Sequence, residues 1–275
     1  MGVPPQLPIE LWEQILSTLA RSYRIEERQH LLDLMRTSRV FAVTIRLILY
    51  ETVVVSQHNV RRVCARIAQD ADAFRRTRGL WMLDPVSPTH VKALSIAFAH
   101  VTSLGGTLYA FRSFGSESLR PRVVVLDDRI PTHDWSQLGP SVHPLLSDAR
   151  HLHVGIALYG EELRRVLELN MLRVEVVFLD VFALPEHPCS PGPFIVFVRA
   201  LLDLRTLTRL RITLSVPVMD KAPELRHRIL ALEDSRLTVA FEEVGFGRKK
   251  SSPRLIPRLL LNSADVYDVF GIGYV

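Results

Sequence analysis

The chain has 275 residues, of which 48% are apolar and 23% charged, a composition typical of a globular protein. A formal charge of +5 is too mild to indicate a nucleic-acid-binding protein, and two distant cysteines give no disulfide framework. No apolar run reaches the roughly 20 residues of a membrane span and no signal peptide is evident, so we expect a reducing compartment, the cytosol or the nucleus.

Three amphipathic helices are expected before residue 53. The first begins near Ile9, the second covers the apolar positions around Leu34, and the third runs over about residues 39–50. Apolar residues recur at helical steps in the first of them, at Leu11, Ile15, Leu16 and Leu19. The β-branched residues 53–55 then favour a strand. A core this small is barely stable alone, so such a module is expected to dock onto its own chain or onto a partner.

This N-terminal pattern resembles the F-box. The resemblance is carried by Leu7-Pro8, Glu10-Leu11, Ile15-Leu16, Leu19, Leu32, Leu34, Met35, Thr37-Ser38-Arg39, Phe41 and Leu49-Tyr50-Glu51-Thr52-Val53. It implies that residues 1–52 form a three-helix module that packs on the Skp-family adaptor of a cullin-RING ubiquitin ligase. The adaptor-binding residues that it implies are Leu7, Pro8, Leu11, Ile15, Leu16, Leu32 and Met35. The alternative is that Leu11, Ile15 and Leu19 only hold the three helices together.

Residues 53–275 alternate between helical and strand-like stretches and are interpreted as a second domain. Helices are predicted over residues 59–76, 104–114, 136–147, 160–169, 194–204, 222–232 and 254–262. Strands are predicted over residues 91–98, 122–127, 151–158, 174–181, 210–214 and 237–241, where apolar residues lie two apart. We expect an irregular loop or a repeat boundary over the proline-rich residues 183–193, and a cap on the exposed end of the domain from residues 265–275.

Two α/β architectures fit this alternation, a doubly wound sheet and an open solenoid. The strands recur about every 24 to 34 residues, which overlaps the leucine-rich-repeat unit. No glycine-rich turn of the nucleotide-binding kind follows a strand. We therefore predict an open leucine-rich-repeat-like αβ solenoid with a mostly parallel sheet in chain order, helices on its outer face, and residues 53–98 as the first strand-helix-strand unit.

Few residues of the sequence suggest a catalytic or metal-binding role. His143, His151 and His153 lie close in sequence but lack further zinc ligands, so we interpret the strand histidines as exposed. Asp127-Asp128 is placed at the end of a strand, where it either caps the next segment or serves catalysis. Cys64 is expected to be a buried thiol. The arginines of residues 61–66 and 75–78 are interpreted as a solvated helix face.

The predicted function is that of a non-enzymatic substrate-recognition subunit of an SCF-type ubiquitin ligase, without cofactor, nucleotide or metal. The adaptor, and through it a cullin, would bind the N-terminal helices, and an unidentified protein substrate would bind the repeat region. Membrane and nucleic-acid partners are not expected. The alternatives are an interaction scaffold whose degenerate F-box no longer binds the adaptor, and an enzyme on an α/β sheet. The absence of any complete catalytic set argues against the enzyme.

Overall fold

A computed structural model of the chain describes residues 8–22, 28–106, 110–111, 114, 119–131, 143–158, 173–183, 191–216 and 222–243. The helices are α1 (Ile9–Ser22), α2 (Arg28–Thr37), α3 (Arg39–Glu51), α4 (Val60–Gln69), α5 (Pro88–Ala97), α7 (His143–Leu146), α8 (Pro191–Leu202) and α9 (Ala222–Leu230). The strands are β1 (Thr52–Val55), β2 (Gly79–Met82), β3 (Ser103–Gly106), β4 (Val123–Pro131), β5 (His151–Leu158), β6 (Val176–Ala183), β7 (Arg209–Val216) and β8 (Leu237–Glu243).

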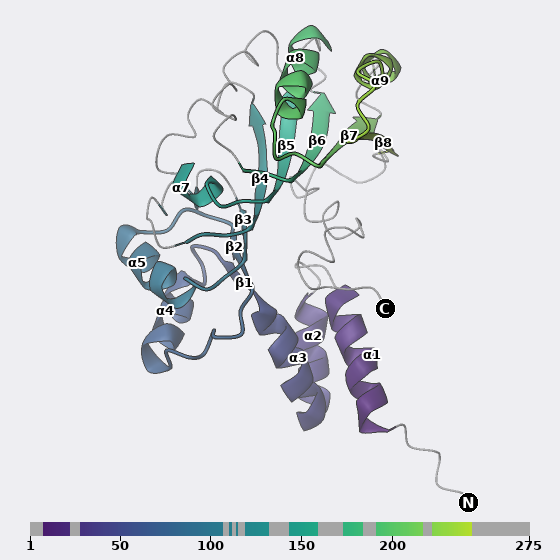
Figure 1. Ribbon diagram of the computed structural model, residues 1–275. Coiled ribbons are helices and arrows are strands. Elements are labelled where there is room, and N and C mark those ends of the chain that lie inside the picture. The colour runs from purple at the N-terminus through teal and green to yellow at the C-terminus, as the bar shows by residue number, and fades with distance from the viewer. Residues whose placement is uncertain are drawn as a thin grey trace, which may run out of the picture.

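Helices α1, α2 and α3 form a module of their own at the beginning of the chain (Figure 1). Its core contains Leu16 of α1, 3% exposed, and Ile45 of α3, fully buried, with Leu34, Met35 and Phe41 packed against them. The three predicted helices are thus confirmed. Helix α3 ends at Glu51 and β1 begins at the next residue, so the module continues directly into the second domain.

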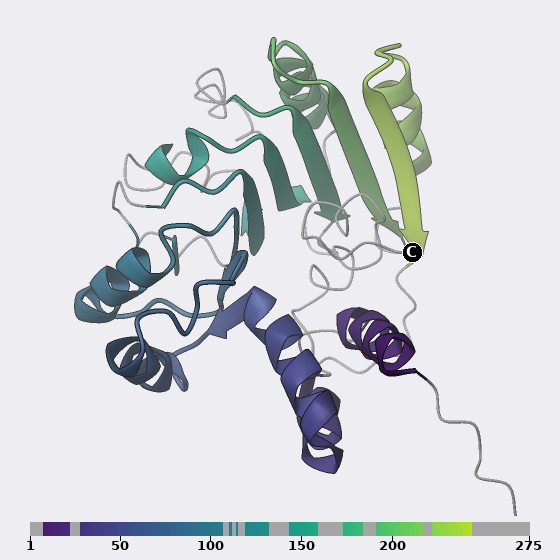
Figure 2. The same ribbon diagram turned by 60° about the horizontal axis from the view of Figure 1, so that its bottom comes forward.

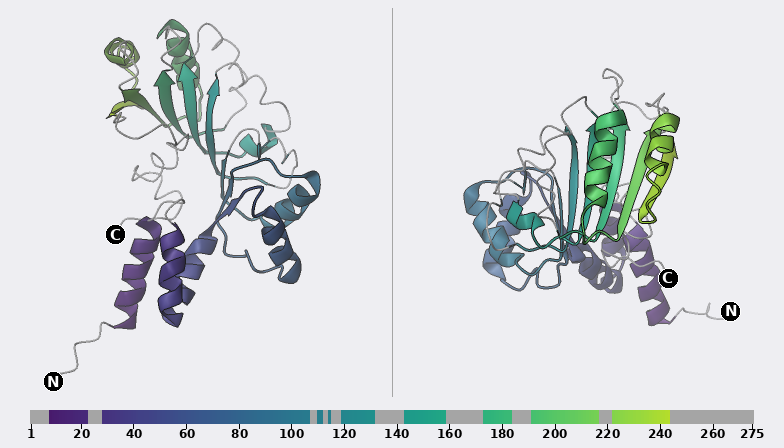
Figure 3. Two further views of the ribbon diagram at one scale, coloured as in Figure 1. Left: turned by 180° about the vertical axis from the view of Figure 1, so that it is seen from behind. Right: turned by 45° about the horizontal axis from the view of Figure 1, so that its top comes forward.

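The eight strands of the described residues form one sheet in which all neighbours are parallel and the order follows the chain from β1 to β8. The sheet bends into an open arc, and α4, α5, α7, α8 and α9 lie along its outer side (Figures 2 and 3). The prediction of a parallel sheet in chain order is confirmed. A doubly wound sheet is excluded because it would place the strands out of chain order.

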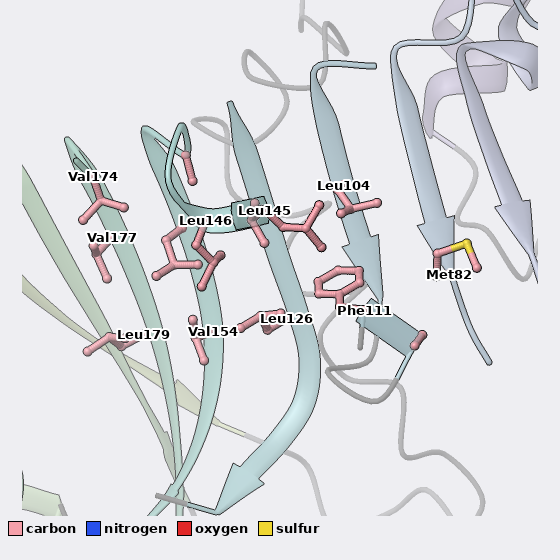
Figure 4. Close-up of a cluster of buried hydrophobic side chains, with 14 of the residues drawn as sticks. Met82, Leu104, Phe111, Leu126, Leu145, Leu146, Val154, Val174, Val177 and Leu179 are labelled. Atoms are coloured by element: carbon pink, nitrogen blue, oxygen red, sulfur yellow. The ribbon is translucent and has the colours of Figure 1, made fainter. Parts of the chain in front are cut away.

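The core of the second domain lies between the sheet and the outer helices. Side chains alternate along a strand, and one row of neighbours across six strands is at most 2% exposed: Leu80, Leu104, Val124, Leu152, Val177 and Leu210. A second row contains Met82, Leu126, Val154, Leu179 and Ile212. Phe111, Leu145 and Leu146 pack on these rows from the helix side, as Figure 4 shows.

Three elements early in the second domain differ from the sequence prediction. Residues 91–98 were predicted as a strand but lie in and directly after helix α5, which has Pro88 in its first turn. Residues 79–82 form β2, which was not predicted. Residues 104–106 belong to β3 and not to a helix. The single predicted strand-helix-strand unit therefore contains two helices, α4 and α5, and two strands, β1 and β2.

Most other predicted elements of the second domain are confirmed. Strands β4 to β8 and helices α8 and α9 overlap the predicted stretches, and α7 lies within the predicted helix of residues 136–147. Helix α4 ends at Gln69, so the arginines of residues 75–78 are exposed on a loop and not on a helix. The predicted helices of residues 160–169 and 254–262, most of the loop of residues 183–193 and the cap of residues 265–275 lie outside the described residues.

Candidate functional site

The first candidate surface is an apolar stripe on α1, formed by Leu11, Trp12 and Ile15. Their exposed fractions are 43%, 37% and 46%, high for large apolar side chains on one helix. The carbonyl oxygen of Pro8 accepts hydrogen bonds from the backbone N–H of Leu11, at 3.1 Å, and of Trp12, at 3.2 Å. Pro8 thereby closes the first turn of α1, and this sets where the α1 stripe begins.

The predicted adaptor-binding residues divide between the surface and the core of the module. Pro8, Leu11 and Ile15 are exposed. Leu16 is buried and the half-buried Met35 packs against it, so these two support the surface from beneath. Leu7 and the side chain of Leu32 lie outside the described residues.

Trp12 is a member of the α1 stripe that the sequence analysis placed only beside the apolar face. Its ring lies 5.6 Å from that of Phe41 on α3, measured between centroids, in a tilted arrangement. The indole therefore contacts the module on one side and remains open to a partner on the other. The signal that could have identified it is the Leu-Trp pair at positions 11 and 12, directly after the turn at Pro8.

The second candidate surface is the face of the sheet opposite the outer helices, which we call the helix-free face because no helix of the described residues lies on it. One row of register partners runs across it from β1 to β7: Val54, Trp81, Gly105, Val125, His153, Phe178 and Arg211. It is apolar over β1 to β4 and becomes polar and cationic toward β7. Trp81, Val125 and Phe178 are buried, at 4%, 1% and 7% exposure.

The indole of Trp81 lies flat over Gly105 on the neighbouring strand. A Cβ atom on Gly105 would stand 2.1 Å from Cε3 of this ring, far inside van der Waals contact. Only glycine leaves room for the ring at this position. The next residue, Gly106, has a φ of +148° and is equally restricted to glycine, because its Cβ would meet the carbonyl oxygen of Met82.

A buried polar pair occupies the middle of the helix-free face. His153 on β5 and Asp180 on β6 are 6% and 3% exposed, and Nε2 of His153 lies 2.5 Å from Oδ2 of Asp180. Because a carboxylate only accepts hydrogen bonds, Nε2 carries the proton. The His153 ring also packs on Phe178, with centroids 5.8 Å apart. This pair fixes β5 against β6 by a charge-assisted contact.

The prediction of exposed strand histidines is wrong for His153. Its partner Asp180 is 27 residues away in sequence and lies diagonally across the β5–β6 pair. Sequence spacing shows no such contact before the register is known. His151 is half-buried, where burial lowers the pKa of its imidazole, the nearby Glu175 carboxylate raises it and Arg150 lowers it. The side chain of His143 lies outside the described residues.

The acidic pair Asp127-Asp128 was predicted to end its strand, but the strand continues beyond it. Strand β4 continues to Pro131, and its register with β5 shifts between Leu126 and Arg129. The two aspartates therefore form a bulge within β4, a feature that bends a strand locally. Their side chains lie outside the described residues.

Among the described residues, no three His, Cys, Asp or Glu side chains are grouped closely enough to hold a metal ion. Cys64 on α4 is half-buried, and burial raises the pKa of its thiol, so it is a poor nucleophile. None of the described helices is long and apolar enough to cross a membrane. No protein-family model matches the chain, and no curated protein matches its sequence.

Proposed function

We propose that the chain is a substrate-recognition subunit of an SCF-type cullin-RING ubiquitin ligase. The module of α1, α2 and α3 binds the Skp-family adaptor, and the sheet domain, a leucine-rich-repeat-like solenoid, binds a protein substrate. The observation that carries this proposal is the exposure of Leu11, Trp12 and Ile15 on one helix. Apolar side chains left in water on a module with so small a core favour a protein partner.

Helix α3 continues directly into β1, and this supports a chain in which the helical module binds the adaptor and the sheet domain binds the substrate. Because α3 ends at Glu51 and β1 begins at Thr52, no flexible linker separates the proposed adaptor-binding module from the sheet. A substrate held by the sheet domain would keep a defined position relative to the ligase. In this mechanism the chain performs no bond chemistry and takes no cofactor, and it accelerates ubiquitin transfer by raising the effective concentration of the substrate.

The second candidate function is a non-catalytic scaffold with a degenerate F-box. It shares the sheet domain and differs only in lacking adaptor binding, so the α1 stripe would then meet another protein or a second part of the same assembly. Binding of the Skp-family adaptor by the purified full-length chain separates the two functions.

The test combines Leu11→Asp and Ile15→Asp in one variant and measures adaptor binding by pull-down and calorimetry. We expect a loss of about a hundredfold or more in affinity, because buried apolar contacts at an interface centre carry about 2 kcal/mol or more each and the new carboxylates would be desolvated without partners. Both replaced side chains are close to half exposed, so thermal unfolding followed by circular dichroism should change little.

The matched control is Ile96→Asp on α5, where the isoleucine is 70% exposed on the outer side of the sheet domain. This variant should bind the adaptor as well as the wild type does. A wild-type chain that retains no adaptor would reject the ligase proposal in favour of the scaffold. Equal loss in Ile96→Asp would show that the effect is not a property of the α1 stripe.

A further inference from the structure

The residues directly before β2 to β7 form a ladder across one end of the sheet, which we call the strand-start rim. Its members are Arg78, Thr102, Arg122, Arg150, Glu175 and Thr208. From Thr102 onward, each backbone N–H donates to the carbonyl oxygen of the preceding member of the ladder, at 2.7 to 2.9 Å. Neighbouring strands lie about 4.8 Å apart, so the three arginines, before β2, β4 and β5, are held within about 14 Å of one another.

Two of the three rim arginines are free to bind an anion. Arg150 pairs with Glu175 at 2.5 Å, which neutralises both. The guanidinium groups of Arg78 and Arg122 form neither an ion pair nor a hydrogen bond with any of the described residues, and both side chains are exposed. Glu51 stands next to Arg78 in the ladder, but it already has another interaction.

The flanks of the rim do not neutralise these two guanidinium groups. The loop before β2 adds the exposed Arg75 and Arg76, and one exposed carboxylate outside an ion pair, that of Asp72. Asp148, in the loop before β5, already pairs with Arg120 at 2.9 Å. The rim and its flanks therefore carry a net positive charge, and opposite charge on a partner would be attracted to this end of the sheet.

The spacing of the two free arginines indicates the shape of the anion. Arg78 and Arg122 precede β2 and β4, two strand steps apart, so their backbones are separated by about 10 Å. One phosphate group would require both side chains to converge on a single point against their mutual repulsion. An extended polypeptide with acidic residues at alternating positions presents separate carboxylates about 6.6 Å apart on one side, which two long side chains reach without converging.

We propose that the strand-start rim is a binding site for an acidic segment of another protein, one in which Asp or Glu residues alternate with other residues, and that Arg78 and Arg122 hold its carboxylates. A guanidinium group forms short, charge-assisted and often bidentate hydrogen bonds with a carboxylate. The rim members include no aromatic side chain on which bases could stack, so a single-stranded nucleic acid fits this surface less well.

The consequence for substrate recognition rests on the proposed function. The rim begins where the helical module ends, because the N–H of Arg78 donates to the carbonyl oxygen of Glu51, the last residue of α3, at 2.8 Å. A substrate bound there lies beside the end of α3, and it is selected by its acidic segment. Binding of that segment requires no adaptor. A chain that fails to bind the adaptor would therefore leave this inference intact, and the two proposals fail separately.

Fluorescence anisotropy with the full-length chain tests the site. The probe is a labelled peptide in which Asp alternates with Gly, and the matched peptide has Asn in place of every Asp. The chain should bind the Asp peptide at least tenfold more tightly, and added salt should weaken this binding. Arg78→Gln combined with Arg122→Gln should lower the affinity at least tenfold by removing both charge-assisted contacts. Both side chains are exposed, so the melting temperature should stay unchanged.

The matched control combines Arg61→Gln and Arg62→Gln, which removes the same charge from exposed positions at the beginning of α4. Helix α4 leads from the end of β1 back toward the start of β2, so these two residues lie at the end of the helix farther from the rim. The control should bind the Asp peptide within twofold of the wild type. An equal loss in both double variants would mean attraction by net charge alone and would overturn the proposal.

Three other results would also contradict the site. These are equal binding of the Asp and Asn peptides, tighter binding of a matched peptide with a single phosphoserine, and tighter binding of a single-stranded RNA of similar length. If the rim double variant melts earlier than the wild type, the single variants Arg78→Gln and Arg122→Gln decide. Each of them should then lower the affinity at least threefold, and no loss in either one would reject the rim.

Discussion

At the scale of single residues, the close approach of Trp81 to Gly105 gives the sharpest stability prediction. A Cβ at position 105 would overlap the buried indole at 2.1 Å, so Gly105→Ala forces the ring or β3 to move. Overpacking of this kind costs about 1–3 kcal/mol. Urea unfolding followed by circular dichroism should show a lower midpoint at an unchanged slope.

A double-mutant cycle with Trp81→Ala gives the control for this clash. Without the indole, the added methyl at position 105 has room, so Gly105→Ala should cost almost nothing in the Trp81→Ala background. Gly79→Ala is the comparison, because its Cβ meets the Thr52 side chain at 3.1 Å and requires only a small shift. Equal costs of Gly105→Ala with and without Trp81 would contradict the packing described.

The lowered pKa of His151 predicts that the stability of the folded chain depends on pH. Burial is the largest influence on its imidazole and holds the pKa below the ordinary 6.5, against the Glu175 carboxylate. As the pH falls below 6.5, the unfolded chain takes up a proton that the folded chain binds only at lower pH, so stability falls in that window. His151→Gln should therefore make the decline between pH 7 and pH 5 shallower, by a small amount because the residue is half-buried. Identical slopes in wild type and variant would refute this.

The buried pair of His153 and Asp180 marks a limit of prediction at the residue scale. The alternation of the strand correctly placed His151 and His153 on one face, because side-chain direction follows from the backbone. Whether that face is exposed depends on what lies over it and on which residue of β6 stands opposite. Both depend on tertiary structure, so they cannot be predicted from the pattern of residues within β5.

At the scale of elements, the errors have a common cause. Residues 91–96 alternate apolar and polar side chains, but Val91, Leu94 and Ser95 are also spaced for one buried helical face, while Ile96 is 70% exposed. The decisive signal was Ser87-Pro88, a helix start. Strand β2, buried at every position, shows no alternation, and β3 contains two glycines, so the strand pattern failed for both.

Besides its pairing with β7, strand β8 is connected to neighbouring elements by one arginine, which permits a test of that element. Arg236, directly before β8, donates hydrogen bonds to the carbonyl oxygens of Leu202 at 2.7 Å and Leu207 at 3.2 Å, and pairs with Asp234 at 2.6 Å. These contacts tie the edge strand to the end of α8 and the loop before β7. The Asp234 carboxylate, whose pKa the hydrogen bonds of Arg236 lower to about 2, stays charged over the ordinary pH range.

We expect Arg236→Met to loosen β8 without unfolding the sheet. Methionine keeps much of the side-chain length but leaves the two carbonyl oxygens without their donors, at about 1–3 kcal/mol for the part-buried groups. Hydrogen exchange at the β8 amides should then rise about tenfold or more, while β4 to β6 stay protected. Arg228→Met on α9, which removes only an exposed pair with Glu224, is the matched control. Equal exchange in both variants would show that Arg236 does not hold the strand.

At the scale of the whole molecule, the parallel sheet was predictable because each unit repeats one pattern. Alternating strand and helix at a regular period limits the topology to few choices, and the missing glycine-rich turn excluded the nucleotide-binding one. The bending of the sheet and its buried helix-free face were not predictable in the same way. They depend on contacts between distant units.

The two cores of the molecule lead to a prediction that connects stability with the proposed function. Among its described side chains the α1–α3 module has only two buried apolar residues, Leu16 and Ile45, whereas the core of the sheet domain extends from β1 to β7. A core that small supports little local stability, so amides of α1 and α3 should exchange with deuterium faster than those of β4 to β6. This order is expected in the free chain at neutral pH.

Adding the Skp-family adaptor should then protect α1 to α3 selectively. A partner that binds only the folded module stabilises it by about 2.7 kcal/mol at a hundredfold excess over its Kd, which slows exchange through local unfolding about a hundredfold. The amides of β4 to β6 should not change, because their core is separate. In the Leu11→Asp/Ile15→Asp variant the protection should disappear. Uniform protection of both domains would instead mean that the adaptor contacts the sheet as well, and protection of neither would leave the α1 stripe to a different partner.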